Sequence, residues 1–321
     1  MVPKKLFLKC YSTICLLNTV PATPLVSFLT VNYRQPEVTL QLLRSLQKLD
    51  YPKWEIIVVE NGDEDSALSG PLANDPRATY YATHQNLGFA GGNNAGLHLC
   101  KGEYTLFINN DTEVEPDFLS SLISFVVKQP KLGMLSPKIC FYQQPDTIQY
   151  AGFYPMSTIT IRNSGIGWME KDLGQYNDVR TTAYIHGAAM LVPRKVIDEV
   201  GVMYEDYFLY YEEYDWCERI KQAGYEIWYY GASTVYHKES VSTGQDSPLK
   251  IYYLTRNRLL FARRNYPAWR SALAFLYFGL VAVPKNTLQW FLKGRKDLAM
   301  AFLKGFWWNL THKAKPRENR N

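Results

Sequence analysis

The chain has 321 residues, of which 47% are hydrophobic, and its net charge is +5. It can bury a full core, which excludes a disordered protein. The charge is uneven, because residues 250–321 hold 15 Lys and Arg against two acidic residues, whereas residues 1–249 hold 20 basic and 28 acidic residues. A basic, aromatic carboxyl quarter suits an anionic membrane surface, and we expect no nucleic acid partner.

The five cysteines are scattered and include no Cys-X-X-Cys pair. This argues against a disulfide framework or a zinc site and favours a reducing cytoplasm. Residues 1–23 resemble a signal peptide only weakly, because Lys9 interrupts a diluted apolar stretch. We interpret them as an amino-terminal extension and expect a cytoplasmic protein.

Two β-α units follow this extension. Residues 25–33 predict a strand that runs into a polar turn, and leucines recur at helical spacing in residues 40–46. Residues 55–59 predict a second strand, which leads directly into the acidic loop 60–65. Apolar strands that alternate with amphipathic helices predict an α/β fold with a mostly parallel sheet covered on both faces. The acidic loop is alternatively a solvated turn with a helix N-cap.

A string rich in glycine and asparagine, residues 84–96, follows a third predicted strand near residues 79–82. Glycines let backbone N–H groups approach a ligand at the start of a helix, which is how phosphates are held with little positive charge. The spacing matches neither a Walker loop nor the GxGxxG of dinucleotide folds. Close packing of a helix on the sheet also explains the glycines, but leaves Asn86, Asn93 and Asn94 unexplained.

The motif on which the interpretation centres is the polar end of another buried strand. Residues 104–108 are apolar and stop at Asn109, Asn110 and Asp111, before a helix that begins at Pro116. Ligands bind at the carboxyl ends of strands in open α/β sheets. An Asp with Asn neighbours is suited to hold a hard divalent cation against phosphate oxygens. An Asx turn that caps the helix is the alternative.

An acidic helix start comes later in the chain. Glu212, Glu213 and Asp215 lie in the aromatic stretch 207–219. Favourable charge on the helix dipole partly explains the three acids. Aromatic surroundings, however, raise the pKa of a carboxylate towards the range in which it accepts a proton from a hydroxyl. We therefore expect a general base among these acids.

Four motifs, residues 26–33, 58–62, 86–93 and 107–112, occur in the order seen in family 2 glycosyltransferases. The chain resembles the rhamnosyltransferase-like branch, which builds bacterial surface polysaccharides, over about residues 25–265. The resemblance implies the GT-A fold, a Rossmann-like, mostly parallel sheet with helices on both faces, to which this chain adds C-terminal amphipathic helices. It also implies a nucleotide-diphosphate sugar donor (a dTDP- or UDP-sugar), a divalent cation (Mg²⁺ or Mn²⁺) and inversion at the anomeric carbon.

The resemblance assigns roles around the donor. Residues 109–111 stand where the family carries Asp-X-Asp, so Asp111 is the main carboxylate facing the metal and Asn109 a weaker oxygen donor or a ribose contact. His237, after the last core strand, completes the metal shell. The residues expected around the nucleotide sugar are Thr30, Asn32, Tyr33, Glu60, Asp63, Asn86, Gly88, Phe89, Gly92, Asn93, Asn109 and Asn110.

The resemblance also places the base. Glu213 matches the catalytic position of the family's acidic pair, next to Glu212. Asp215 stays an alternative, because the longer Glu side chain shifts the reach of the carboxylate. We expect Asp111 and Glu213 to face a single pocket.

The carboxyl half is expected to shape the acceptor side. Residues 138–180 predict a hairpin excursion with a flexible loop, in which residues 164–167 are a lid or an ordinary surface loop. Residues 183–192 predict a strand whose small centre, Gly187 and Ala188, leaves room for a sugar or for tight packing. Two strands, 226–230 and 234–236, precede His237.

The basic end begins with an amphipathic helix over residues 252–264. Its Arg256 and Arg258 are expected to meet the donor diphosphate or an acceptor phosphate, with a solvated basic face as the alternative. Beyond it, residues 266–321 predict helices that lie in a headgroup layer. The longest apolar run, residues 272–283, is shorter than the roughly 20 residues that span a bilayer, so we expect a peripheral protein. A homodimer interface is the competing use of this tail.

Together these features predict a metal-dependent, inverting glycosyltransferase that moves a sugar, with rhamnose as the candidate, to a hydroxyl of a glycan or lipid-linked oligosaccharide acceptor. It would work in cell-surface polysaccharide synthesis on the inner face of the cytoplasmic membrane. The expected parts are an extension (1–23), the GT-A domain (24–265, with a nucleotide-sugar half to 137 and an acceptor half from 138) and the tail (266–321). The alternatives are a sugar nucleotidyltransferase and a non-catalytic glycan- or membrane-binding protein with the same fold.

Overall fold

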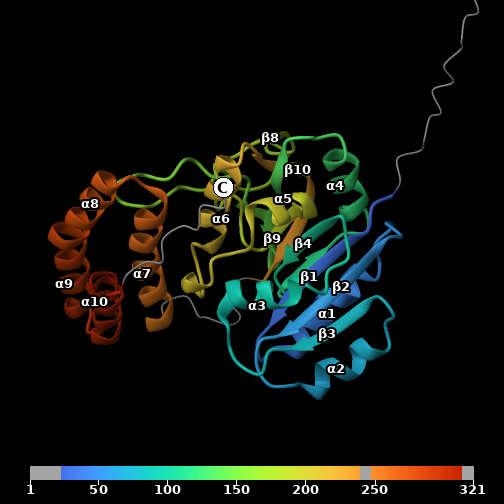
Figure 1. Ribbon diagram of the computed structural model, residues 1–321, viewed down its shortest axis with the longest axis horizontal. Helices are drawn as coiled ribbons and strands as arrows, with labels where there is room; N and C mark the ends of the chain where they lie inside the picture. Colours follow the sequence, from blue (N-terminus) through green and yellow to red (C-terminus); the bar gives the residue numbers. More distant parts are fainter. Residues whose placement is uncertain (1–22, 239–246, 313–321) are drawn as a thin grey trace, which may run out of the picture.

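The computed structural model describes residues 23–238 and 247–312 and contains one mixed sheet (Figure 1). Its strands are β1 Val26–Asn32, β2 Trp54–Glu60, β3 Ala78–Ala82, β4 Tyr104–Ile108, β5 Thr112–Val114, β6 Leu132–Phe141, β7 Gln144–Tyr150, β8 Val179–Thr181, β9 Ala189–Pro193 and β10 Glu226–His237. The helices are α1 Pro36–Leu46, α2 Ser66–Ala73, α3 Gly88–Leu97, α4 Phe118–Val126, α5 Arg194–Val200, α6 Glu212–Gln222, α7 Pro248–Asn265, α8 Ala268–Tyr277, α9 Val283–Leu292 and α10 Lys296–Thr311, with a π-helical turn, η2 Phe278–Ala282, between α8 and α9.

The sheet has the order β3-β2-β1-β4-β9-β6-β10-β5. Strands β1 to β4 are parallel, β9 runs antiparallel to β4 and β6, and β10 is parallel to β6. The short β5 pairs antiparallel with β10, and β7 and β8 pair with β6 and β10. The predicted α/β fold with a mostly parallel sheet is therefore confirmed, and the carboxyl ends of β1, β2 and β4 lie at one edge.

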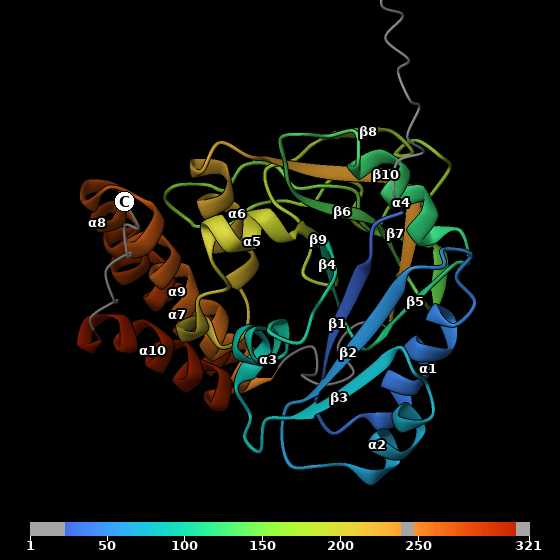
Figure 2. The ribbon, with the colours of Figure 1, turned by 45° about the vertical axis from the view of Figure 1, so that its right-hand side comes forward.

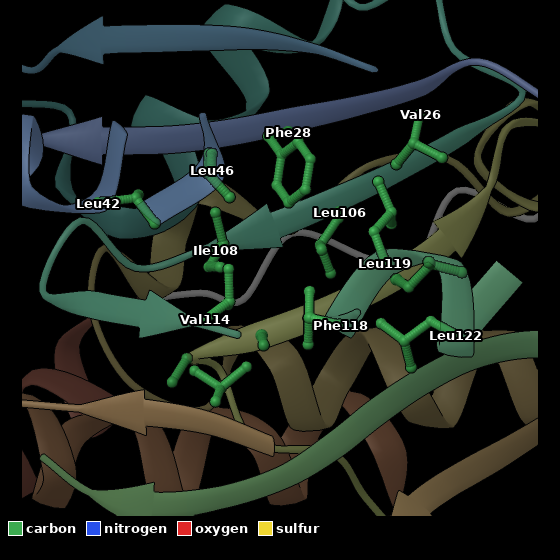
Figure 3. Packing of buried hydrophobic residues seen from close by; sticks show 14 of the residues in the cluster. Val26, Phe28, Leu42, Leu46, Leu106, Ile108, Val114, Phe118, Leu119 and Leu122 are labelled. Carbon is green, nitrogen blue, oxygen red and sulfur yellow. The ribbon is translucent and has the colours of Figure 1, made fainter. Parts of the chain in front are cut away.

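Helices cover both faces of this sheet because the core strands are apolar on both sides. Phe28 and Leu106 face α1 and α4 in one hydrophobic cluster (Figure 3). Their neighbours Leu29 and Phe107 point to the other face, into the cluster that includes α3 and α6 residues. Successive strand residues alternate between faces, so each central strand supplies both cores.

Tight packing explains two glycines of the 84–96 string. A Cβ at Gly92 would lie 2.9 Å from the Val31 side chain, and one at Gly96 would lie 2.6 Å from Leu29. Both distances are too short for a real Cβ contact, so α3 lies directly on β1 only because these positions are glycine.

Two local predictions differ from the structure, and one open alternative is decided by it. Residues 183–188 are not part of a strand, since β9 begins at Ala189. The two strands expected between 226 and 236 form the single strand β10, with an irregularity between Tyr230 and Thr234. Residues 164–167 do not form a free lid, because Ile166 N donates to Gly152 O at 2.8 Å and Ser164 O accepts from Tyr154 N at 3.1 Å.

The carboxyl helices lie together beside the sheet, next to α6 (Figures 1 and 2). Helix α10 returns to α7, where Asn309 Nδ2 donates to Arg256 O at 2.9 Å and Arg263 Nη1 donates to Asn309 O at 3.1 Å. From Ala268 to Leu292 the helix is continuous, and an 18-residue window of it has a mean hydropathy of 1.2, so by length and composition it is long and apolar enough to cross a membrane. The uninterrupted apolar run of residues 272–283 is thus part of a longer helix, and the shortness of that run does not by itself exclude a span.

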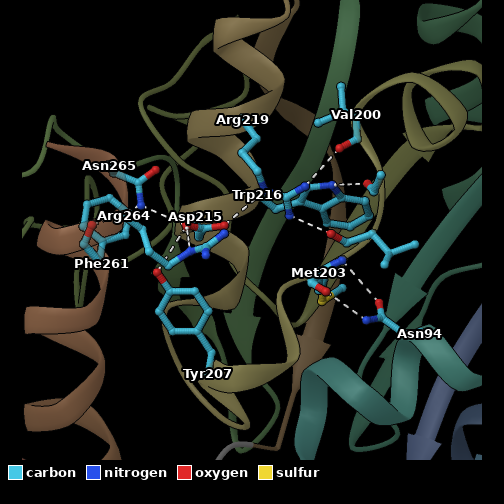
Figure 4. A network of polar contacts seen from close by, with 12 residues as sticks. Asn94, Val200, Met203, Tyr207, Asp215, Trp216, Arg219, Phe261, Arg264 and Asn265 are labelled. Atoms are coloured by element: carbon cyan, nitrogen blue, oxygen red, sulfur yellow. Dashed lines mark hydrogen bonds and ion pairs between the residues drawn. The ribbon is translucent and has the colours of Figure 1, made fainter. Parts of the chain in front are cut away.

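A buried ionic network joins α6 to α7 (Figure 4). Asp215 accepts from Arg219 Nε and Arg264 Nε, both at 3.1 Å, and from Asn265 Nδ2 at 2.9 Å. Tyr207 Oη donates to it at 3.2 Å. Burial opposes the ionisation of Asp215, but the charges of the two arginines outweigh it and lower its pKa. Asp215 is thus a structural counter-ion with both oxygens engaged, and the alternative that it is the base does not fit.

We expect Asp215→Ala to lower the free energy of unfolding by about 3–5 kcal/mol, because it leaves two largely buried guanidinium groups without their counter-charge. Urea unfolding followed by circular dichroism measures this change. Asp198→Ala, at an exposed position of α5, is the matched control and should change stability by less than about 0.5 kcal/mol. Equal stability of the two variants would contradict the structural role of the network.

Candidate active site

Asp111 and His237, which lie far apart in sequence, meet at the edge of the sheet. Asp111 follows β4 and His237 ends β10, and His237 Nε2 lies 3.1 Å from Asp111 Oδ1. On the other side of the ring, Nδ1 lies 2.8 Å from the side-chain amide oxygen Oε1 of Gln149 on β7. That oxygen can only accept, so Nδ1 donates to it, and Nε2 is the ring nitrogen that faces Asp111.

This pair fits a divalent cation held jointly with a substrate. Ligand atoms at adjacent octahedral positions around Mg²⁺ or Mn²⁺ lie about 3 Å apart, which matches the 3.1 Å between the two side chains. The amide of Asn109 borders the pair, with Nδ2 3.4 Å from His237 Nε2. Within residues 23–238 and 247–312, no group of three or more His, Cys, Asp or Glu could hold a metal. Diphosphate oxygens and water would complete the shell, as is usual for Mg²⁺.

A second polar cluster lies at the ends of β1 and β2. Asn32 donates to the buried Glu60, whose pKa is raised by burial. Asn32 Oδ1 accepts from Thr39 Oγ1 at 2.8 Å and from Asn110 Nδ2 at 3.3 Å. The structure thus brings together Asn32, Glu60 and Asn110, whereas Asp63 is exposed in the loop after β2.

Several residues expected at the nucleotide hold the backbone instead. Asn86 Oδ1 accepts from Gly88 N at 2.9 Å, Asn93 Nδ2 donates to Phe89 O at 2.9 Å, and Asn94 Nδ2 donates to Met203 O at 2.8 Å. The asparagines that packing seemed unable to explain therefore have structural partners. Thr30 is fully buried within β1, so it is not part of the turn expected to border the nucleotide. Tyr33 is half-buried just beyond the end of that strand.

The turn before α3 contacts the loop that precedes α6. Gly88 has a φ of +73°, and Phe89 N donates to Phe208 O at 2.6 Å. A Cβ at Gly88 would clash with the same carbonyl. The 84–96 string is therefore joined to the loop that precedes α6.

Glu213 lines a cavity of about 400 Å³. Its walls come from the 138–180 excursion, the loop and start of α6, and α7, through Arg162, Asn163, Tyr210, Tyr211, Tyr214, Leu254 and Arg258. Glu213 Oε2 is buried and has no hydrogen-bond partner among the described residues. Burial raises the pKa of Glu213 to about 7, which suits a group that accepts a proton near neutral pH.

Glu212 is more deeply buried than Glu213 and does not line this cavity. Burial, and then the charge of Glu213, raise its pKa well above the usual range. The two adjacent acids thus differ in their surroundings, because burial opposes the ionisation of Glu212 inside the protein while Glu213 lies at the cavity wall.

The loop before α6 has an unfavourable backbone that α7 holds in place. Phe208, Tyr210 and Tyr211 have φ values of +62°, +69° and +77°. Asn257 Nδ2 lies 2.7–2.9 Å from the carbonyl oxygens of residues 207, 209 and 210. Arg256 Nη2 donates to Tyr207 O at 2.7 Å. The expectation that Arg256 meets a phosphate is wrong, because its buried guanidinium is used by this loop.

A row of rings links the Asp111 cluster to the Glu213 cavity. His186 lies 5.8 Å from His237 and 6.4 Å from Phe153, and Phe153 lies 5.8 Å from Tyr214, measured between ring centroids. Asp111 is not among the residues that line the Glu213 cavity, so that cavity does not meet the expectation of a single shared pocket. A Cβ at Gly187 would meet nothing within 4 Å, which leaves open space beside the row.

Sequence reasoning missed Gln149, Arg162 and His186. All three lie where no motif was recognised, and their roles arise from contacts with residues more than 40 positions away. The apolar alternation near the end of β7 was the available signal for Gln149 alone.

Comparison with known proteins identifies the family. Residues 27–201 match the family model of glycosyl transferase family 2. The chain is 25% identical over 294 residues to the N-acetylglucosaminyl-diphospho-decaprenol L-rhamnosyltransferase of Mycobacterium tuberculosis, covering 83% of this chain and 93% of that protein. It is 24% identical over 240 residues to a low-salt glycan biosynthesis hexosyltransferase of Haloferax volcanii, covering 73% of this chain and 74% of that protein.

A solved structure supports the same fold. A mannosyltransferase from Pyrobaculum calidifontis, in complex with GDP-Man and Mn²⁺, superposes with a TM-score of 0.55 at 13% identity, covering 90% of this chain and 88% of that chain. At this identity the likeness shows the fold alone. The family model matches more than half of the chain, and the chain therefore belongs to glycosyl transferase family 2, with a GT-A-like fold.

Proposed function

We propose that this glycosyltransferase inverts the configuration of a sugar, with rhamnose as the candidate, as it moves it from a nucleotide-diphosphate donor to a lipid-linked acceptor in surface-glycan synthesis. The observation that carries the proposal is the pairing of Asp111 and His237 at one end of the row of rings with the elevated pKa of Glu213 at the other. The relatives named for a rhamnosyltransferase and a glycan hexosyltransferase support the sugar class and the acceptor.

The donor is expected at the sheet edge. Asn32, Glu60 and Asn110 are already hydrogen-bonded to one another, and we expect this polar cluster to contact the nucleoside. Asp111 and His237 would hold Mg²⁺ or Mn²⁺, which would offset the charge of the departing diphosphate. The sugar would then lie along the rings towards Glu213, beside the space at Gly187.

Glu213 supplies the acid-base chemistry. Its carboxylate takes the proton from the acceptor hydroxyl as the oxygen attacks the anomeric carbon from the face opposite the leaving group. A neutral Glu212 next to it avoids a second negative charge at the same helix start, and Asp215 is already neutralised by its arginines.

We also propose that the protein is peripheral on the inner face of the cytoplasmic membrane. The α8–α9 helix exposes Trp269, Leu276 and Leu280, and it carries Lys285 and Asn286 in its second half. Its inner side packs on other helices, as Trp290 does on Phe302 with ring centroids 5.4 Å apart. A helix with one packed side and one apolar side favours an orientation parallel to the surface.

Release of nucleoside diphosphate tests the function. We expect release with a nucleotide sugar only when a lipid-linked acceptor is present, and Glu213→Gln should reduce turnover by about 10²–10⁴-fold while the thermal shift caused by the donor is retained. Glu37→Gln, at an exposed carboxylate of α1, is the control. Donor binding without release for any acceptor would favour the non-catalytic alternative, and pyrophosphate formation from a sugar phosphate and a nucleoside triphosphate would favour the nucleotidyltransferase.

The pH dependence of turnover tests the protonation state. Because the base works as a carboxylate and the pKa of Glu213 is raised to about 7, the rate should rise with pH through about 7 and level off above it. A rate that is flat between pH 5 and 8 in the chemistry-limited regime would exclude Glu213 as the base.

Gln149 offers a test of the cation site that leaves both ligands in place. Gln149→Ala frees the ring of His237, and we expect the affinity for Mn²⁺ to fall by about 10–100-fold, measured by titration in the presence of a nucleoside diphosphate. Gln144→Ala, at an exposed position of the same strand, should leave the affinity unchanged. Unchanged affinity in Gln149→Ala would show that His237 does not act through this contact.

Flotation with anionic vesicles tests the membrane orientation. Leu276→Glu combined with Leu280→Glu removes two exposed apolar side chains, each worth about 1.5–3 kcal/mol when buried, and should reduce the vesicle-bound fraction by more than about tenfold. Leu173→Glu, at an exposed leucine of the excursion, is the control. Wild-type protein should be released by alkaline carbonate, whereas resistance would indicate that the helix spans the bilayer.

A further inference from the structure

Two neighbouring cavities beside α7 share a cationic wall. Arg162 and Arg258 line both the Glu213 cavity and a smaller one of about 70 Å³. Lys285, from α9, also lines the smaller cavity, with Tyr277 and Phe278. Three cationic side chains from three distant parts of the chain therefore gather between the base and the α8–α9 helix.

These cations lack a counter-charge in the described part of the chain. No ion pair to Arg162, Arg258 or Lys285 forms within residues 23–238 and 247–312, and Arg258 Nε donates to the neutral hydroxyl of Tyr211 at 3.1 Å. The positive charge of Arg258, and then burial, lower the pKa of Arg162. Like charges held together cost free energy, which a bound anion would recover.

The position of the cluster indicates which anion it takes. The donor diphosphate is expected at Asp111 and His237, and the rings of His186, Phe153 and Tyr214 lie between that pair and the Glu213 cavity. An anion in the cationic cluster would instead lie next to the base. Since the base approaches the acceptor hydroxyl, the anion belongs to the acceptor.

The helix that supplies Lys285 has an apolar outer stripe. The exposed side chains of this stripe are Trp269, Leu273, Leu276, Leu280 and Leu288. Successive members are four, three, four and eight residues apart, which places them on one side of the helix. Tyr277, Phe278 and Lys285 face the cavity. One helix thus borders both an anion site and a surface suited to lipid.

We propose that Arg162, Arg258 and Lys285 bind the diphosphate of a membrane lipid that carries the acceptor sugar, with the lipid chain against the α8–α9 stripe. This inference rests on the proposed function, and it specifies how the acceptor is recognised. Three cations from separate elements match the charge of a diphosphate, and charge-assisted hydrogen bonds from arginine suit phosphate oxygens.

Binding of the full chain to vesicles tests the site. Phosphatidylcholine vesicles carry a polyprenyl diphosphate, a polyprenol or phosphatidylglycerol. We expect wild-type protein to prefer the diphosphate vesicles over both others by at least about tenfold. Arg162→Ala combined with Lys285→Ala, two exposed positions, should abolish the preference. Lys293→Ala, an exposed lysine after α9, should retain it.

The outcomes separate the site from its alternatives. A preference that survives in the double variant overturns the proposal. Soluble pyrophosphate could instead stabilise the protein through the same two residues while the protein shows no preference among the vesicles. That result overturns the assignment of a lipid ligand. Loss of the thermal shift caused by nucleotide sugar and Mn²⁺ in the double variant places the donor in this cluster and also overturns it.

The same measurements separate this inference from the proposed function. A variant-sensitive vesicle preference in a protein that transfers no sugar supports the site and refutes the function. Sugar transfer with an unchanged Michaelis constant for the lipid acceptor in the double variant refutes the site and leaves the function standing.

Discussion

The hydrogen bonds from α7 to the loop before α6 are the constraint on which the candidate site depends. Three non-glycine residues of this loop have positive φ, which costs about 1–3 kcal/mol each. Asn257 and Arg256 offset part of this cost because they donate hydrogen bonds to the loop carbonyls. The ion pair between Asp215 and Arg264 also fixes α6 to α7. Glu213 is therefore held by a backbone that would not adopt this shape alone. The same loop also accepts a hydrogen bond from Phe89 N, so the turn before α3 and the loop before α6 meet at Phe208.

The distribution of charge follows from this arrangement. Burial opposes the ionisation of Glu212, and two arginines pair with Asp215, so that Glu213 is the carboxyl that lines the cavity with a pKa raised to about 7. The carboxylate of Asp111 is set apart by the row of rings. Arg162 and Arg258 line the same cavity as Glu213, and with Lys285 they also line the smaller cavity beside the apolar helices. An acidic donor side and a cationic acceptor side are compatible with a reaction that handles two anionic substrates.

Local patterns predicted some of the site and failed for identifiable reasons. The ends of β1, β2 and β4 carry Asn32, Glu60 and Asp111 as the strand pattern predicted, because parallel strands bring their carboxyl ends to one edge. Arg256 and Asp215 were misread because a charged side chain with a buried partner has the same sequence signature as one that faces a ligand. Arg162 and Gln149 carry no local motif, and only the return of the excursion to α6 and β10 gives them a role.

The sequence by itself determined the family, the α/β class, the polar strand ends and the acidic helix start, because periodicity and motif order are local properties. Only the tertiary structure decided which acid can act as a base, that Asp111 meets His237 while Gln149 bonds the other side of its ring, and that the carboxyl helix is long enough to span a membrane. The physical reason is that burial, pairing and desolvation of a charged group depend on residues far away in the chain. Asp215 and Glu213 are two positions apart, yet one has a lowered pKa and the other a raised one, because Asp215 pairs with Arg219 of α6 and Arg264 of α7 whereas burial dominates at Glu213.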